Sequence, residues 1–181
     1  MQNIKMRVVG GQYSRRHIIY DGDKDIRPTK DIVRQGIFNA LGHDVVGKRV
    51  LDLFAGTGAL GIEALSRGAE AVTLVDQSSA GIKLIKTNTS YIEKGVDIVR
   101  QDYSSFIQRA TKESYDLLFL DPPYHLDVKA ILEAVDTAQL LKPSAIVVLE
   151  SDKPLAFFIE SGKIKSYKYG ITHVTIWWRN I

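Results

Sequence analysis

LDLFAGTGALG, residues 51–61, decides the fold, because it joins an apolar run to a helix-like pattern through closely spaced glycines. Gly56, Gly58 and Gly61 have the spacing G-x-G-x-x-G, which lets a strand turn sharply into a helix and brings a cofactor close to the backbone. Asp52 stands before them, where a carboxylate would repel the pyrophosphate of a dinucleotide. S-adenosylmethionine (SAM) carries an ammonium and a sulfonium but no phosphate. The stretch therefore favours SAM, unless Asp52 only caps the turn.

Strand-like and helix-like patterns alternate along most of the chain. We expect strands at residues 50–54, 71–75, 96–100, 115–121 and 145–150, and helices at 29–42, 59–67, 79–92, 103–110, 128–141 and 154–161. In the first helix, Thr29 is the expected N-cap, Gly42 marks the end and Gly36 weakens the interior. Continuous apolar strands between helices are typical of a parallel sheet that is covered on both faces.

The two ends of the chain break this alternation. KIKSYKY (163–169) and THVTIWW (172–178) flank a two-residue turn, which requires an antiparallel strand. Residues 6–11 and 16–22 predict a short N-terminal hairpin. We therefore predict an α/β, Rossmann-like sheet of the class I SAM methyltransferases, mostly parallel, with a C-terminal antiparallel hairpin. The expected organisation is one domain over 1–181, with a hairpin arm at 1–26 and a SAM-binding catalytic body at 27–181.

Composition narrows the chemistry. The chain of 181 residues has 45% hydrophobic and 25% charged residues, which is typical of one globular domain. It contains no cysteine, so thiolate metal sites and cysteine nucleophiles are excluded, and methylation should fall on nitrogen or oxygen. The four histidines show no metal-ligand spacing, so we expect no metal. No apolar run is as long as a membrane span, so we expect a cytoplasmic protein without membrane contact.

Positive charge is concentrated in the N-terminal part of the chain. Residues 1–50 hold ten Lys and Arg against five Asp and Glu, whereas residues 51–181 hold fourteen against sixteen. A basic arm beside a near-neutral body indicates contact with nucleic acid, and Arg15, Arg16 and Arg34 are the candidate residues. The alternative is that these arginines are ordinary solvated surface.

Acids follow three successive strands of the predicted sheet, and they are Asp52, Asp76 and Asp102. Ligands of open α/β sheets bind outside the carboxyl ends of the strands, so these acids should converge on one crevice. Asp76 lies 20 residues after Gly56, a distance typical of an acid that binds ribose hydroxyls. Asp102, with Tyr103 beside it, is placed for the adenine amine. Singly, each acid could equally be a turn or cap residue.

LFLDPPYH, residues 118–125, is the most specific stretch for chemistry. An exocyclic amine of a base is a poor nucleophile because its lone pair is delocalised into the ring. If Asp121 and the Pro122 carbonyl each accept one of its N–H bonds, the lone pair points toward a sulfonium methyl. Pro123 stiffens the turn, and Tyr124 offers a ring on which the base can stack. The alternative is a rigid turn with a half-buried tyrosine.

Four segments together resemble one family. RPTKDIVRQGIFNALG (27–42), VLDLFAGTGALGIEALSRGA (50–69) and FLDPPY (119–124), with GGQYSRR (10–16) upstream, resemble the bacterial RsmD-type methyltransferases, which modify the exocyclic amine (N2) of a guanine in 16S ribosomal RNA. The resemblance covers nearly the whole chain. Relatives often have Glu and a small hydroxyl residue where this chain has Gln35 and Gly36, so no role is carried over there.

This resemblance implies SAM as cofactor and 16S rRNA or the small ribosomal subunit as partner, and we expect a monomer. It implies that Asp121, Pro122, Pro123 and Tyr124 form the catalytic turn, and that Arg27, Pro28 and Thr29 close over the cofactor. The residues expected to hold SAM are Arg27, Thr29, Asp52, Phe54, Gly56, Thr57, Gly58, Asp76, Gln77, Asp102 and Tyr103.

Three other functions stay open. A DNA adenine amino-methyltransferase uses the same turn but usually needs an additional target-reading region. In a protein glutamine methyltransferase this turn usually begins with Asn, whereas here it begins with Asp121. A non-catalytic RNA-binding protein could keep the fold, although the intact glycine turn and Asp121 argue against it.

Overall fold

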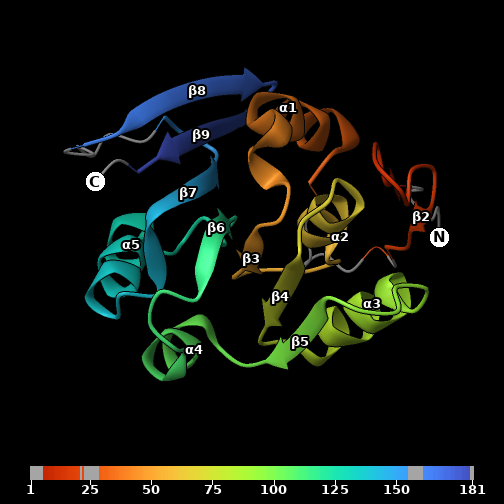
Figure 1. Cartoon of the computed structure of the whole chain (residues 1–181), viewed down its shortest axis with the longest axis horizontal. Helices are drawn as coiled ribbons and strands as arrows, with labels where there is room; N and C mark the ends of the chain where they lie inside the picture. The colour runs from red at the N-terminus through yellow and green to blue at the C-terminus, as the bar shows by residue number, and fades with distance from the viewer. Residues whose placement is uncertain (1–5, 21, 23–28, 155–160, 180–181) are drawn as a thin grey trace.

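A computed structural model describes residues 6–20, 22, 29–154 and 161–179. Its main sheet has the strand order β5-β4-β3-β6-β7-β9-β8 (Figure 1). These strands are β3 (Arg49–Asp52), β4 (Ala71–Asp76), β5 (Val96–Arg100), β6 (Tyr115–Leu120), β7 (Leu141–Ser151), β8 (Lys163–Tyr169) and β9 (Thr172–Trp178). Strands β5, β4, β3, β6 and β7 pair in parallel, whereas β9 is antiparallel to both β7 and β8. The predicted fold class is confirmed.

Helices cover both faces of the sheet. On one face lie α1 (Asp31–Leu41), α2 (Ala59–Ser66) and α3 (Ser79–Thr89), and on the other lie α4 (Tyr103–Arg109) and α5 (Val128–Thr137). Successive residues of a strand point to opposite faces, so Leu117 of β6 packs with the first group and Leu118 with the second. Because both faces are buried, the inner strands are continuously apolar, as the sequence pattern indicated.

Several boundaries differ from the prediction. Helix α1 is capped by Lys30 and not by Thr29, although Gly42 ends it as expected; a 3₁₀ turn (Gly42–Val45) follows. Helices α3 and α5 end before Tyr91 and Ala138, earlier than their patterns predicted. The helix expected at 154–161 falls mostly outside the described residues.

The N-terminal hairpin is present but has short strands, β1 (Met6–Arg7) and β2 (His17–Ile18). Side chains of α2 and α3 hold this hairpin in place. The Glu63 carboxylate accepts hydrogen bonds from the backbone N–H groups of Val9 (2.7 Å) and Gly10 (2.8 Å). The side chain of Asn88 accepts from the Ile19 N–H and donates to the Ile19 carbonyl. The arm is therefore docked on the body by backbone pairing with buried side chains.

The order of the strands determines where a ligand can bind. The chain runs from β3 outward to β4 and β5, and then returns to place β6 on the other side of β3. The connections after β3 and β6 consequently diverge at the carboxyl ends of these two strands. Such a switch point is the usual ligand crevice of an open α/β sheet.

Candidate active site

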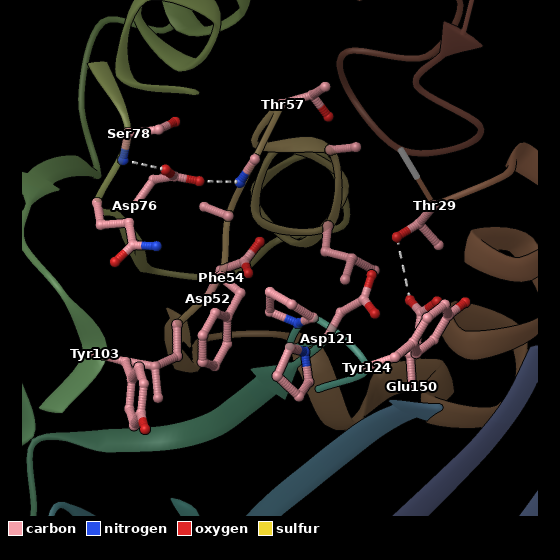
Figure 2. A pocket seen from close by; sticks show the side chains of 18 of the residues that line it. Thr29, Asp52, Phe54, Thr57, Asp76, Ser78, Tyr103, Asp121, Tyr124 and Glu150 are labelled. Atoms are coloured by element: carbon pink, nitrogen blue, oxygen red, sulfur yellow. Dashed lines mark hydrogen bonds between the residues drawn. The ribbon is translucent and has the colours of Figure 1, made fainter. Parts of the chain in front are cut away.

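A cavity of about 680 Å³ opens at this switch point, a size that is ordinary for a small-molecule site. Its wall comes from the segments after β3, β4, β5 and β6, from the start of α1, from the end of β7 and from the start of β9. Twelve of the candidate residues lie close together along it. These are Thr29, Asp52, Phe54, Gly56, Thr57, Asp76, Gln77, Tyr103, Asp121, Pro122, Pro123 and Tyr124. Figure 2 labels eight of them, Thr29, Asp52, Phe54, Thr57, Asp76, Tyr103, Asp121 and Tyr124.

The glycine turn between β3 and α2 depends on left-handed backbone. Gly56 has a φ of 52° and Gly58, the N-cap of α2, has a φ of 79°, values that side chains disfavour. Gly61 lies in the first turn of α2, where an added Cβ would overlap the side chain of Leu74. Gly58 does not itself line the cavity, so its effect on the site is to shape the turn.

Asp76 holds this turn against the end of β4. One carboxylate oxygen accepts the Gly56 N–H at 2.9 Å and the other accepts the Ser78 N–H at 2.7 Å (Figure 2). The carboxylate therefore fixes the glycine turn while it faces the cavity. A carboxylate oxygen has two lone pairs, so Asp76 keeps acceptor capacity for ligand hydroxyls.

Asp52 is the most perturbed acid of the cavity. Its side chain is only 2% exposed, and its Oδ2 atom has no hydrogen-bond partner among the described residues. Burial, reinforced by the nearby Asp121, raises the pKa of Asp52 to about 7. A buried carboxylate with an unused acceptor is suited to a cationic ligand group, so the site fits the ammonium of SAM.

The turn after β6 forms the opposite wall. Asp121 and Pro122 follow the last strand residue, and Tyr124 is 54% exposed at the opening. The Pro123 carbonyl accepts the Leu126 N–H at 2.9 Å, whereas no described residue donates to the Pro122 carbonyl. That carbonyl is consequently available to a ligand, as the sequence interpretation requires.

An aromatic pair closes a third side. The rings of Phe54 and Tyr103 are 5.3 Å apart between centroids and tilted by 41°. Asp102, which was predicted to reach the adenine amine, does not line this cavity. Its exposed carboxylate caps α4 by accepting the Ser105 N–H at 3.0 Å, and this hydrogen bond lowers the pKa of Asp102. The structure thus places Asp102 as a helix cap, the alternative that the sequence left open.

Glu150 is a cavity residue that the sequence interpretation missed. It lies at the end of β7, is almost completely buried, and accepts a hydrogen bond of 3.2 Å from the Thr29 hydroxyl. The rule that identified Asp52 and Asp76, an acid where an apolar parallel strand ends, would also have found it. Arg27 and Pro28, expected beside Thr29, lie outside the described residues.

The candidate RNA-binding arginines have different environments. Arg15 and Arg16 are exposed on the arm, and Arg16 lies over the ring of Tyr91. Arg34 is fully buried, and its guanidinium donates to the carbonyls of Thr29 and Arg7 and to the Asp31 carboxylate. The prediction that Arg34 contacts RNA is wrong, because this side chain is used internally to join α1 to the arm.

Within the described residues, no group of three or more His, Asp and Glu side chains is arranged to hold a metal ion. None of the described helices is long and apolar enough to cross a membrane.

Comparison with known proteins agrees with the geometry. The chain is 36% identical over 180 residues to the "Putative rRNA methyltransferase YlbH" of Bacillus subtilis, covering 95% of this chain and 98% of that protein. It is 33% identical over 156 residues to "Ribosomal RNA small subunit methyltransferase D" of Escherichia coli (strain K12), covering 82% and 75%. The solved structure described as "Putative methyltransferase yhhF from Escherichia coli" superposes with a TM-score of 0.84 at 28% identity, covering 97% and 98%.

The sheet order and the cavity at its switch point define a SAM-dependent methyltransferase of the Rossmann-like class. The family model described as "Conserved hypothetical protein 95" matches residues 6–178. The chain therefore belongs to this family, the RsmD-type methyltransferases.

Proposed function

We propose that this protein methylates the exocyclic amine (N2) of a guanine in 16S ribosomal RNA, acting as a monomer in the cytoplasm. One observation carries the proposal: the Pro122 carbonyl, to which no described residue donates, shares a cavity with the unpartnered Asp52 oxygen. The carbonyl can accept a hydrogen bond from an amine N–H, and the carboxylate oxygen can bind a cation. The relatives named as ribosomal RNA methyltransferases support RNA as the substrate.

Three parts of the wall hold the cofactor in this proposal. The Asp52 carboxylate binds the ammonium end, Asp76 accepts hydrogen bonds from ribose hydroxyls, and the Phe54–Tyr103 pair lies against the adenine. Gln77 and Thr57 line the same stretch of wall. SAM supplies an electrophilic methyl group on a sulfonium.

The turn at 121–124 orients the nucleophile. The Asp121 carboxylate and the Pro122 carbonyl accept the two N–H bonds of the guanine amine, which directs the nitrogen lone pair into the cavity. Positive charge develops on that nitrogen during transfer, and the adjacent carboxylate stabilises it. The exposed ring of Tyr124 stacks on the base at the opening.

The direct test is transfer of a tritiated methyl group from SAM to unmodified 16S rRNA and to small subunits. Nuclease digestion and mass spectrometry of the nucleosides should then give N2-methylguanosine. A duplex DNA rich in adenine serves as the competing substrate, because a DNA adenine methyltransferase uses the same turn. N6-methyladenine as the product would contradict the proposal, and so would the absence of transfer to any RNA.

The turn is tested by two sets of variants under single-turnover conditions at saturating SAM. Asp121→Asn keeps the size but removes the charge, so transfer should fall about 100-fold or more with SAM affinity little changed. Asp97→Asn, on the exposed face of β5, is the matched control and should keep its activity. Wild-type transfer by Asp121→Asn would exclude the carboxylate role.

Tyr124→Phe should retain most activity because the ring remains, whereas Tyr124→Ala should lose about 1–3 kcal/mol of base binding. Equal losses in the two variants would show that the hydroxyl, and not the ring face, is needed.

A further inference from the structure

A second hollow, of about 520 Å³, lies between α1 and β8. We call it the α1–β8 groove. It is lined by Ile32, Gln35, Gly36, Asn39 and Ala40 of α1 and by Lys165, Tyr167 and Tyr169 of β8. Figure 1 shows the β8–β9 hairpin beside α1, at the edge of the sheet. One wall thus presents amide and aliphatic side chains, and the other presents a lysine and two tyrosine rings.

The groove and the active-site cavity share their walls. Lys30, the N-cap of α1, and Val33 of α1 line the cavity, while Ile32 between them lines the groove. On the hairpin, Thr172 lines the cavity and its paired residue Tyr169 lines the groove. A substrate that puts a base into the cavity can therefore continue along α1 into the groove.

Exposed large hydrophobic side chains occur beside the two hollows. Ile32 on α1 and Ile171 at the tip of the hairpin are both exposed, as is Tyr124 at the cavity opening. Exposed apolar side chains at the edge of a site suit an unstacked base or sugar, which presents flat apolar faces.

The hairpin wall is positively charged. Residues 161–179 contain Lys163, Lys165, Lys168 and Arg179 and no acid. The ammonium groups of Lys163 and Lys165 lie 5.1 and 6.0 Å from the ring centroid of Trp178. Neither lysine has a carboxylate within 4 Å in the described part of the chain.

Two described acids near the groove, Asp31 and Asp44, are already engaged. Asp44 accepts the Trp178 indole N–H at 2.8 Å, and Asp31 is paired with the buried Arg34. Arg179, at the far end of the hairpin, is paired with Asp136. The charge available to a ligand in the groove is therefore that of Lys165, which lines it, and of Lys163, which lies two residues away on the same face of β8.

We propose that the α1–β8 groove binds the single-stranded RNA that flanks the target nucleotide. Phosphates contact Lys163 and Lys165, and a base neighbouring the target stacks on Tyr167, because the Tyr169 ring already packs against Gly36 of α1. Strand β8 is about 20 Å long, enough for a few nucleotides. This inference rests on the proposed function, because it assumes an RNA substrate.

RNA suits the groove better than a protein does. Interface cores between proteins are depleted of lysine, and an edge strand with lysines opposes pairing with a strand of another chain. Single-stranded nucleic acid, in contrast, is typically bound by lysines that alternate with aromatic rings along a groove.

Two variants test the groove in different ways. Lys163→Ser with Lys165→Ser removes its charge, and Gln35→Trp fills it without a change of charge. The matched control is Lys94→Ser with Lys112→Ser. These two lysines precede β5 and β6, so they lie at the amino ends of the strands, whereas the cavity lies at the carboxyl ends. Circular dichroism and thermal unfolding verify that each variant is folded.

Filter binding of naked 16S rRNA and methyl transfer to it are both measured, at several salt concentrations. The charge variant should weaken RNA binding and raise KM about tenfold, and should reduce the salt slope of log K by roughly one to two units. Gln35→Trp should raise KM with the salt slope unchanged. SAM affinity and kcat should stay at the wild-type values in both, and the control variant should match wild type throughout.

Unchanged RNA binding and KM in both groove variants would overturn the proposal. If the variants are impaired only on assembled small subunits and not on naked RNA, the groove receives a protein, which also overturns it. The absence of any methyl transfer by wild type would refute the proposed function instead. Filter binding alone would then test whether the groove binds RNA, and equal binding by wild type and the charge variant would overturn that proposal.

Discussion

Asp52 is the residue whose chemistry depends most on its surroundings. Its carboxyl group is buried at the end of β3, with Asp121 and Asp76 near it. Burial and the repulsion from Asp121 favour the neutral form and raise the pKa of Asp52 to about 7. A cation placed against this group reverses the balance, because it stabilises the ionised form. Cofactor binding should therefore be linked to loss of a proton from Asp52.

This linkage predicts a pH dependence of cofactor affinity. S-adenosylhomocysteine keeps the ammonium of SAM, so its affinity should fall about tenfold between pH 8 and pH 6, as Asp52 becomes protonated around a pKa of about 7. Calorimetry in two buffers of different ionisation enthalpy at pH 7 should show proton release on binding. Asp52→Asn should bind weakly at pH 8 and show no slope down to pH 6. The same slope in wild type and variant would assign the titration to another group.

Single residues also show what sequence can and cannot predict. An acid at the end of a strand identified Asp52 and Asp76 as cavity residues, because strand position determines where such a side chain emerges. The same pattern did not decide the role of Asp102, which lies outside the cavity wall and caps α4, the alternative that the sequence left open. A charge count contains no information on burial, so it does not separate the buried Arg34 from the exposed Arg15 and Arg16. The burial of Arg34 depends on long-range packing, which local sequence does not encode, whereas the cap at Asp102 is a local contact.

At the scale of elements, hydrophobic periodicity predicted the positions of strands and helices. It did not explain why a glycine, Gly36, stands in the interior of α1. Glycine in a helix interior costs about 1 kcal/mol relative to alanine. In the structure, the Tyr169 side chain of β8 lies against Gly36, and an added Cβ would overlap its ring and hydroxyl. The glycine therefore lets α1 and β8 approach closely, and this contact is part of the α1–β8 groove. Neither element alone predicts it.

A double-mutant cycle between α1 and β8 tests this contact. Gly36→Ala should destabilise the wild-type protein by about 1–3 kcal/mol, since overpacking outweighs the gain in helix propensity. In a Tyr169→Ala background, where the overlapping atoms are absent, the same substitution should stabilise by about 0.5–1 kcal/mol. Urea unfolding of the four proteins gives both free energies. An effect of Gly36→Ala that is equal in the two backgrounds would mean that Tyr169 does not restrict the helix.

At the scale of the whole molecule, positive charge lies in two places and not one. A net charge counted over residues 51–181 hides the positive charge of the β8–β9 hairpin, because all sixteen acids of that stretch precede residue 161. The arm is docked on α2 and α3, while the hairpin lies beyond α1 at the edge of the sheet (Figure 1). The fold thus separates two basic surfaces that an RNA can contact at the same time, with the cavity opening at the carboxyl ends of the strands.

This separation predicts that the two surfaces contribute independently to RNA binding. Arg15→Ala with Arg16→Ala should weaken binding of 16S rRNA and reduce the salt slope by roughly one to two units, with SAM affinity unchanged. The arm should stay folded, because Glu63, Ser66 and Asn88 hold its backbone by hydrogen bonds in which neither arginine side chain takes part, and the contact of Arg16 with the Tyr91 ring is the one that is lost. Sites that share no partner are additive within about 0.5 kcal/mol. Combining these changes with Lys163→Ser and Lys165→Ser should therefore add the two losses of binding free energy and the two reductions in slope, both read from filter binding over a salt series. A combined loss no larger than the greater single loss would show that the RNA contacts one surface at a time. An unchanged salt slope for the arm variant would show that Arg15 and Arg16 are ordinary solvated surface residues.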